Sequence, residues 1–362
     1  TSTGDLDFGV SAGINCTTPG FGGTGNTHAS RTGFFELGQL QAMGRSQLPA
    51  NSWMQTQMTA NMNINQTCNA NWNGAAVNFY RQGNGCRNTG EIAGIFDHEW
   101  GHGLDDNDAN GSILSTGSEG IADIYANLRL SDSCVGRGFN LSNAGCGGYG
   151  NPCIDPPGTT PICSGVRDAD WAHRSANTPT TLTSIGSCGG EVHCVGYLNA
   201  ETGWDLWNRH LTGGTFNYSR SLAREIATQL TFRGAGAVVN WWSGAAPNGG
   251  CAADTGYQNY LVADDDNGSL ADGTPHMQAI YDAFNTHEIA CTIPTVTTAG
   301  CAGGPTTAPV VTPTSQDKSV DLAWTAVSGA SSYRVYRTDG LYGCEFGKTL
   351  VAEIAGLAYT DN

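Results

Sequence analysis

The short motif His98-Glu99-Trp-Gly-His102 constrains this chain more than any other feature of its sequence. In a helix, His98 and His102 lie one turn apart on the same face, with roughly 5–6 Å between their Cβ atoms. Two imidazoles at that spacing can bind one tetrahedral Zn²⁺ ion. Glu99 then lies beside the metal, close enough to take a proton from a metal-bound water. The apolar residues at 92–96 predict that the helix packs against a core, which holds its ligands rigidly.

A second helix is predicted at 117–126, and it carries two carboxylates, Glu119 and Asp123, one turn apart. A catalytic zinc site has three protein ligands and leaves one position for water, so Glu119 is the candidate third ligand. A zinc-bound histidine usually donates its other ring N–H to a carboxylate, and Asp123 is placed to accept it. The alternative is a solvated acidic helix face, which the upstream histidine pair makes the weaker interpretation.

The charge of the chain excludes several classes of partner. The 362 residues carry a formal net charge of −16, with a sequence pI near 4.6. Nucleic acids and anionic membranes select basic surfaces, so we expect neither as a partner. The sequence also has no run of 18 apolar residues, and no membrane-spanning helix is predicted.

The 13 cysteines indicate an oxidising compartment. None of them forms a Cys-x-x-Cys pair, and the predicted zinc ligands include none of them. Such cysteines in an acidic chain predict a disulfide framework, and therefore a secreted, extracellular protein. Cys68 and Cys86 flank one predicted strand and are candidates for a bridge. The other pairings cannot be read from the sequence.

Hydrophobic periodicity predicts a mixture of helices and strands, the α+β class. The predicted helices include 28–47, 92–103, 117–126, 196–211, 219–230 and 275–284, and the predicted strands are 58–65, 74–80, 319–324 and 332–337. A Thr/Pro/Gly-rich linker is predicted at 292–309. It separates a large domain of residues 1–291 from a small tail of residues 310–362.

The residues that follow the histidine motif form a candidate calcium loop. Asp106, Asp108 and Asn110 alternate, and Gly111 follows, as in the first half of an oxygen-ligand Ca²⁺ loop. The bidentate glutamate of the twelfth position is missing, because Gly117 stands there. Two interpretations remain open, a Ca²⁺ site and a plain acidic loop that ends the helix.

Several segments, in this order, resemble the gluzincin metallopeptidases, and within them the thermolysin and fungalysin families. Asn69-Ala70-x-Trp is similar to the substrate-binding edge strand of those families. The motif at 98–102 and Glu119-x-x-x-Asp123 are similar to their zinc ligands, their general base and the aspartate that orients a zinc-bound histidine. The resemblance implies that Asn69 and Ala70 hold a substrate backbone in an extended conformation, as an added strand.

Two further segments carry the resemblance toward the helical part of those enzymes. Gly-Glu191-Val-His193 is similar to the segment with the histidine that steadies the transition state, and Gly-Val166-Arg167 to the segment with the arginine that binds the substrate carbonyl. The aspartate that normally orients this histidine is not at its expected place, and Glu191 is the candidate substitute. Ile95 and Val166 correspond to apolar pocket positions. They imply a preference for bulky apolar residues just after the cleaved bond.

The resemblance also implies a two-lobed fold, with a mixed-sheet lobe at about 1–125 and a mainly helical lobe at about 126–291. Three departures stand out. No tyrosine lies between His102 and Glu119, where thermolysin-like enzymes place a second oxyanion donor. The Cys-rich insert near 132–165 has no counterpart. The tail resembles only the first half of a fibronectin type III domain, with Trp324 and Tyr333 as its core aromatic residues, so we expect a longer native product or a remnant.

Together, the motif and the resemblance imply a secreted, monomeric zinc endopeptidase that acts on a protein or peptide substrate. Glu99 serves as general base and His193 as the transition-state donor. One rival is a zinc-containing adhesion or carbohydrate-binding module, in which a fourth protein ligand closes a structural metal site. The other rival is a metalloenzyme that acts on something other than peptide bonds. The Asn69 strand argues against it, because it suits an extended peptide.

Overall fold

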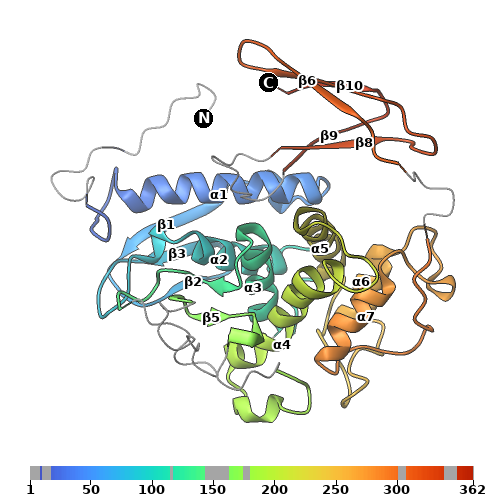
Figure 1. The fold of residues 1–362 in the computed structure, drawn as a ribbon. Helices are drawn as coiled ribbons and strands as arrows, with labels where there is room; N and C mark the ends of the chain where they lie inside the picture. Colours follow the sequence, from blue (N-terminus) through green and yellow to red (C-terminus); the bar gives the residue numbers. More distant parts are fainter. Residues whose placement is uncertain are drawn as a thin grey trace, which may run out of the picture.

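The computed structural model describes residue 9 and residues 18–114, 117–142, 163–173, 180–300, 307–337 and 349–361. These residues form a mixture of helices and strands, so the α+β character is confirmed (Figure 1). The α-helices are α1 (His28–Gln47), α2 (Ala93–Asp106), α3 (Gly117–Leu130), α4 (Val192–Asp205), α5 (Arg220–Ala235), α6 (Gly256–Asp264) and α7 (Met277–Thr286). The strands are β1 (Thr59–Ile64), β2 (Ala70–Trp72), β3 (Ala76–Tyr80), β4 (Cys134–Val135), β5 (Arg167–Asp168), β6 (Val311–Ser315), β7 (Val320–Trp324), β8 (Tyr333–Arg337), β9 (Thr349–Ile354) and β10 (Ala358–Asp361).

Helix α1 has the bounds that the sequence predicts, and local chemistry sets both of them. At its start, the Thr27 side chain accepts from the Ser30 N–H, and the Ser30 hydroxyl accepts in return from the Thr27 N–H. This reciprocal capping box satisfies two backbone donors that have no partner within the helix. The helix stops before Pro49, which disfavours helical geometry in the residue before it.

Beneath α1 lies a three-stranded sheet in the order β1-β3-β2 (Figure 1). Strand β1 runs parallel to β3, and β2 runs antiparallel to it. Strand β2 therefore forms the edge of the sheet in the described part of the chain. The strands predicted at 58–65 and 74–80 correspond to β1 and β3, and a short 3₁₀-helix, Trp53–Gln55, precedes them.

Helices α2 and α3 lie side by side at the centre of the molecule, and small residues let them approach closely. A Cβ atom added to Gly101 of α2 would come within 2.8 Å of the Ala122 backbone of α3. Helix α4 packs equally closely on the other side of α3, where a Cβ at Gly120 would be 2.5 Å from the Gly196 carbonyl oxygen. These contacts leave no room for a larger side chain, and they fix the relative positions of the three helices.

The C-terminal helices differ from the prediction in extent. The helix predicted at 196–211 starts earlier, at Val192, and changes after Asp205 into a π-helix, η6 (Leu206–Leu211). The helix predicted at 219–230 continues to Ala235, and α6 was not predicted at all. Helix α7 lies within two residues of its predicted position. Figure 1 shows α5, α6 and α7 packed together beside α3 and α4.

Four disulfides lie within the described residues, and they join Cys68 to Cys86, Cys134 to Cys163, Cys188 to Cys194 and Cys251 to Cys291. The first confirms the predicted bridge across the β3 strand. Cys146 and Cys153, two cysteines of the Cys-rich insert, lie outside the described residues. Disulfides of this number support the predicted oxidising compartment.

The segment predicted as a linker does not run free along its whole length. Its first residues pack against the large domain, where Thr298 forms an isolated bridge with Thr274 and Val296 covers the core. Residues 301–306 of this segment lie outside the described part of the chain. The linker therefore begins later than residue 292.

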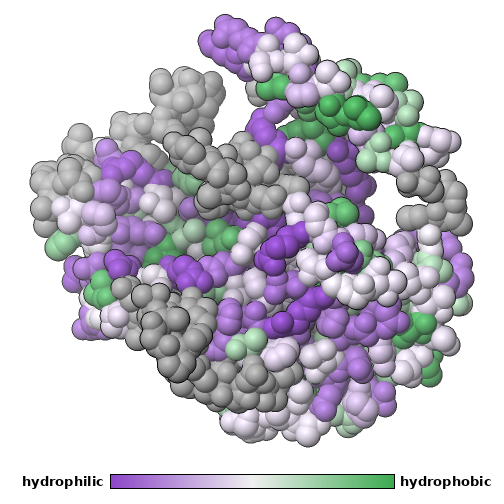
Figure 2. All heavy atoms as spheres, in the orientation of Figure 1, coloured by the Kyte–Doolittle hydropathy of each residue, from purple (hydrophilic) through white to green (hydrophobic). Residues whose placement is uncertain are grey.

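The tail forms two small sheets, one of three strands (β10-β7-β6) and one of two (β8-β9). Trp324 is buried, and its ring lies 5.6 Å from that of Tyr333, as expected for the aromatic core. Figure 2 shows hydrophobic residues gathered on the tail, whereas most of the visible face of the large domain is hydrophilic. Tyr336 of β8 accepts a hydrogen bond of 2.7 Å from Gln229 of α5, which ties the tail to the large domain.

No helix among the described residues is both long and apolar enough to cross a bilayer.

Candidate metal centre

Three side chains from α2 and α3 converge at the centre of the molecule. The Nε2 atoms of His98 and His102 are 3.1 Å apart. The Oε2 atom of Glu119 lies 3.3 Å from the first nitrogen and 3.6 Å from the second. Within the described residues, this is the one group of three His, Cys, Asp or Glu side chains whose ligand atoms gather closely enough to hold a metal ion.

These distances fit zinc. Two nitrogens that each bind zinc at 2.0–2.1 Å in a tetrahedral site lie about 3.3 Å apart, close to the observed separation of His98 and His102. The Oε2 atom of Glu119 is buried and has no hydrogen-bond partner, although it points at the imidazole nitrogens. A buried oxygen of this kind normally has a partner, and a bound cation would supply one. The described residues can therefore hold a metal ion.

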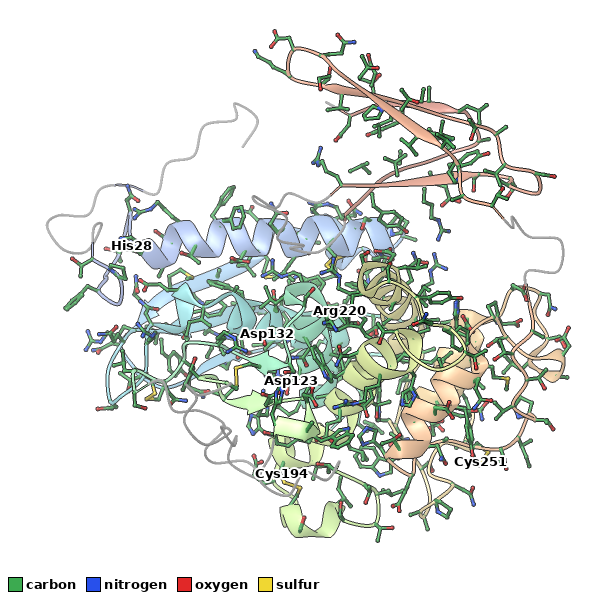
Figure 3. All side chains as sticks on the ribbon, viewed as in Figure 1. His28, Asp123, Asp132, Cys194, Arg220 and Cys251 are labelled. Atoms are coloured by element: carbon green, nitrogen blue, oxygen red, sulfur yellow. A yellow bond between two sulfur atoms is a disulfide. The ribbon has the colours of Figure 1, made fainter. Side chains whose placement is uncertain are left out.

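A buried carboxylate orients the first histidine. The Nδ1 atom of His98 lies 2.7 Å from Asp123, which leaves the Nε2 atom for a metal. Asp123 lies in the middle of the molecule (Figure 3) and is almost completely buried. Burial alone would lower the pKa of His98, but the Asp123 carboxylate raises it to about 10. The histidine that we expect to bind a metal is therefore protonated when the metal is absent.

Arg167 completes this buried arrangement. Its Nε and Nη2 atoms donate to the two oxygens of Asp123 at 2.6 and 2.7 Å. Arg167 is only 4% exposed. Its Nη2 atom also lies 3.4 Å from the Nδ1 atom of His98. Burial opposes ionisation of Asp123, but Arg167 and His98 hold its pKa well below the usual range. The carboxylate is thus kept charged as an acceptor for His98.

Glu99 points into the same site from α2, and the edge strand holds it there. Its Oε2 atom accepts a hydrogen bond of 2.8 Å from the Trp72 backbone N–H of β2. The Trp72 N–H therefore points away from β3 and toward the metal site. Successive residues of a strand alternate in direction, so the N–H and C=O of Ala70 face the same way. The edge of β2 lies open to the site and can pair with an extended peptide.

His193 approaches the metal site from the first turn of α4. Its Nε2 atom lies 3.4 Å from the Oε2 atom of Glu119, and its Nδ1 atom lies 2.7 Å from Glu191. The second oxygen of Glu191 accepts from the Cys194 N–H at 2.7 Å, and Glu191 is the N-cap of α4. The side chain predicted to replace the missing aspartate therefore contacts His193 and fixes its ring.

A cavity of about 860 Å³ surrounds these groups. Most of the side chains that the sequence singled out line it, namely Asn69, Ala70, Ile95, His98, Glu99, His102, Glu119, Arg167 and His193. Val166, the second predicted pocket residue, lies in the wall with Ile95. The structure thus brings the predicted residues to one place.

Two of the predicted residues have partners that the sequence did not suggest. Arg167 is engaged by Asp123, and only its remaining N–H groups can reach a substrate. The backbone C=O of Asn69 accepts from the Thr89 hydroxyl at 3.0 Å, which anchors the start of β2. Both residues still line the cavity. Their roles in substrate binding stay predictions.

The candidate calcium loop is held by hydrogen bonds. Asp106 accepts from the Trp72 indole at 2.5 Å and from the Ser112 hydroxyl, and the Asn110 amide donates to Ala237 at the end of α5. Burial, and then the charge of nearby carboxylates, raises the pKa of Asp108 to about 7. The Oδ1 atom of Asp108 is buried and has no hydrogen-bond partner, and calcium binding stays a prediction.

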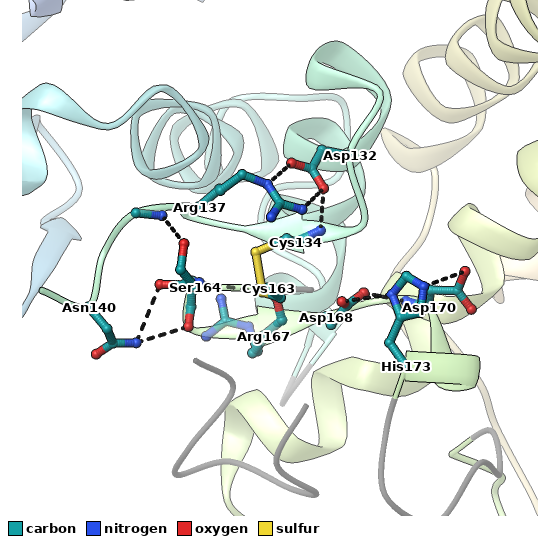
Figure 4. Close-up of a disulfide and its surroundings, with 12 residues drawn as sticks. Asp132, Cys134, Arg137, Asn140, Cys163, Ser164, Arg167, Asp168, Asp170 and His173 are labelled. Carbon is teal, nitrogen blue, oxygen red and sulfur yellow. Dashed lines mark hydrogen bonds and ion pairs between the residues drawn. A yellow bond between two sulfur atoms is a disulfide. The ribbon is translucent and has the colours of Figure 1, made fainter. Parts of the chain in front are cut away.

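The insert near 132–165 is attached to the sheet beside the cavity, which the sequence did not predict. The Cys134–Cys163 disulfide joins its two ends, and the Asn140 amide donates to the Gly165 carbonyl at 3.1 Å (Figure 4). The Phe139 carbonyl accepts from Arg87 of the main body at 2.9 Å. Phe139 and Asn140 consequently form one wall of the cavity.

Two further residues, Ser118 and Asp105, were missed. The Ser118 hydroxyl lies 3.1 Å from the Nδ1 atom of His102. The Asp105 side chain is 1% exposed and interacts with Ser118. The only sequence signal was position, because Ser118 directly precedes Glu119 and Asp105 lies one turn after the histidine motif.

A scan against protein-family models and a search of curated proteins found no match for this chain.

Proposed function

We propose that this protein is a secreted zinc endopeptidase of the thermolysin and fungalysin type. The observation that carries the proposal is the arrangement of His98, His102 and Glu119, with Glu99 directed into the same site. Two histidines and one glutamate are a ligand set of catalytic zinc sites, which keep a fourth position open. The identity of the metal and the reaction are the two parts of the proposal that need an experiment.

When bound, zinc would lower the pKa of a coordinated water toward ~7 and polarise the scissile carbonyl. Glu99 would take the proton from the attacking water and deliver it to the leaving amine. Glu99 is only 5% exposed, and the Trp72 N–H donates to one of its carboxylate oxygens. The other oxygen is left to act as the base.

His193 would donate a hydrogen bond to the negative charge that develops on the substrate. Because Glu191 holds the Nδ1 atom, only Nε2 faces the site. A ring with protons on both nitrogens can therefore donate its Nδ1–H to Glu191 and its Nε2–H to the substrate. The sequence has no tyrosine between His102 and Glu119, where thermolysin-like enzymes place a second donor. His193 is therefore the donor on which this mechanism depends.

The open edge of β2 supports a peptide as the substrate. Ala70 presents its backbone groups toward the cavity, and an extended chain can add to β2 through them. Ile95, Val166 and Phe139 form an apolar part of the wall. We therefore keep the expectation that bulky apolar residues are preferred just after the cleaved bond.

The two-lobed architecture of thermolysin-like enzymes is part of the same proposal. The sheet of β1, β2 and β3 precedes the metal site in sequence, and α4 to α7 follow it. The site lies where these parts meet, at α2 and α3 (Figure 1). The disulfides support secretion, since such bridges persist in oxidising compartments.

The alternative is an adhesion or carbohydrate-binding module with a structural metal. A structural zinc site is closed by four protein ligands. The nearest further nitrogen is the Nε2 atom of His193, which lies 3.4 Å from Glu119. His193 does not belong to the group of side chains whose ligand atoms all lie within 4.8 Å of one another, so no fourth protein ligand among the described residues closes the site. These contacts favour the hydrolase.

A Glu99→Ala variant tests the proposal. It should fold, bind one zinc ion per chain, and lose peptide hydrolysis by several orders of magnitude, because the base is absent. Zinc content measured by mass spectrometry and cleavage of a fluorogenic peptide are the two readouts. Native-like cleavage by the zinc-loaded variant would contradict the mechanism. Treatment of the native protein with phenanthroline should stop cleavage, and added zinc should restore it.

A further inference from the structure

His102 has a different environment from His98, although both are candidate ligands. Asp123, a carboxylate, accepts from the Nδ1 atom of His98. The partner of the His102 Nδ1 atom is instead the Ser118 hydroxyl, at 3.1 Å. A carboxylate can only accept, whereas a hydroxyl can either accept or donate. The contact with Ser118 alone therefore leaves the proton position on His102 undecided.

The position of this proton decides whether His102 can bind a metal. Its Nε2 atom faces His98 and Glu119 in the candidate site. A neutral imidazole binds a metal through the nitrogen that carries no proton. His102 must therefore carry its proton on Nδ1 and donate it to Ser118. If the Ser118 hydroxyl donated to Nδ1 instead, the proton would sit on Nε2 and block the ligand atom.

Asp105 determines the direction in which the Ser118 hydroxyl donates its hydrogen bond. It lies in the last turn of α2 and is almost fully buried, and its carboxyl group interacts with the Ser118 side chain. Both of its oxygens also accept from the Ile113 N–H at 3.2 Å. Burial, the largest influence, raises the pKa of Asp105 to about 6, which leaves a carboxylate at neutral pH. An ionised carboxylate has no proton to give, so the Ser118 hydroxyl must donate to it.

We infer that Asp105 and Ser118 form a relay that holds His102 in the tautomer required for metal binding. The Ser118 proton points at Asp105, and the Ser118 oxygen lone pairs point at the Nδ1–H of His102. Asp105 and Ser118 are thus positioning residues, since they act through His102 and not on the substrate. This inference rests on the proposed zinc centre, and it assigns a function to two residues of this chain that the mechanism above does not use.

The variant Asp105→Asn separates the relay from a simple packing role. The Ile113 N–H still needs an acceptor, so the new amide keeps its oxygen toward Ile113 and turns its NH₂ group toward Ser118. Ser118 then accepts from the amide and donates to His102. The variant conserves the size and hydrogen-bonding capacity of the side chain, yet it reverses the direction of the relay.

The test uses two readouts on the full chain. Ring tautomers are measured in the metal-free protein by ¹⁵N NMR with labelled histidine, and the His102 signals are assigned by their loss in His102→Gln. The native protein should show the Nδ1–H tautomer, and Asp105→Asn should shift it to Nε2–H. Zinc affinity, measured by competition with a chromogenic chelator, should fall about 10–100-fold in Asp105→Asn and in Ser118→Ala, as for other residues that orient metal ligands.

Ser112→Ala serves as the matched control, because it removes a hydroxyl that donates to the adjacent carboxylate Asp106. Its zinc affinity should stay within twofold of the native value. An Nε2–H tautomer in the native protein, or unchanged zinc affinity in both relay variants, overturns the inference. If the native chain binds no zinc, the proposed function fails, and the change of tautomer between the native protein and Asp105→Asn still decides whether the relay exists.

Discussion

Replacement of Arg167 by methionine is the perturbation whose outcome the structure defines best. Arg167 and Asp123 form a two-pronged ion pair with side chains only 5% and 2% exposed. Methionine keeps part of the side-chain volume but leaves Asp123 buried without its main cation. Removal of one partner from a buried pair costs about 3–5 kcal/mol of unfolding free energy. At about 1.4 kcal/mol per factor of ten, the ratio of folded to unfolded protein falls roughly 140- to 4,000-fold.

Stability is measured by urea unfolding and by thermal unfolding. Both use EDTA-treated protein, so that metal binding does not contribute to stability. The thermal midpoint should fall by roughly 6–20 °C. Arg137→Met is the matched control, because Arg137 pairs with Asp132 where their side chains are 48% and 26% exposed. Loss of such an exposed pair costs at most about 1 kcal/mol.

The same variant separates two roles of Arg167. The resemblance predicts that it binds the substrate carbonyl, whereas the structure shows it bound to Asp123. A large loss of stability together with weaker zinc binding is the result we expect, because His98 depends on Asp123. If Arg167→Met is as stable as the Arg137 variant and only the KM for peptides rises, the reasoning about the buried pair is wrong.

Two other predictions concern the histidines of the site. A Cys188→Ser/Cys194→Ser double variant should lower kcat with little change in KM, because that disulfide closes the short loop around His193; the loss of stability should be about 2 kcal/mol for its sequence separation of 6. Zinc binding at pH 8 should release at least one proton per ion, because Asp123 raises the pKa of His98 to about 10 and the ligand must be neutral. Affinity for zinc should therefore rise with pH until His98 has lost its proton.

Each of these has a control. Loss of the Cys251–Cys291 disulfide, with a sequence separation of 40, should cost about 4 kcal/mol and leave kcat unchanged. If both disulfide variants lose activity in proportion to stability, the first bridge does not position His193. Proton release is obtained by calorimetry in two buffers of different ionisation enthalpy, and the same heat in both buffers at pH 8 would show that His98 binds zinc without giving up a proton.

The candidate metal ligands were predictable because their spacing is local. Helical geometry alone places His98 above His102 and Glu119 above Asp123. The one long-range inference was that these two helices face each other. It followed from the need of a catalytic zinc site for a third protein ligand. Helix α1 was predicted to the residue because apolar residues recur at helical spacing along it and Pro49 marks its end.

Contacts between distant segments could not be predicted in this way. Arg167 and Asp123 are 44 residues apart, and their pairing depends on where β5 lies relative to α3. Helix α6 has only nine residues, and a helix that short depends on tertiary packing for its stability. The Ser118 contact was missed for a different reason, since serine in the first turn of a helix usually has only a capping role.

The most direct test of the central claim is a crystal structure of the zinc-loaded protein with anomalous data at the zinc absorption edge. The account predicts one zinc ion at about 2.0–2.2 Å from His98 Nε2, His102 Nε2 and a Glu119 oxygen, with a water in the fourth position and Glu99 within hydrogen-bonding distance of that water. An ion bound elsewhere, or one closed in by a fourth protein ligand, would contradict it.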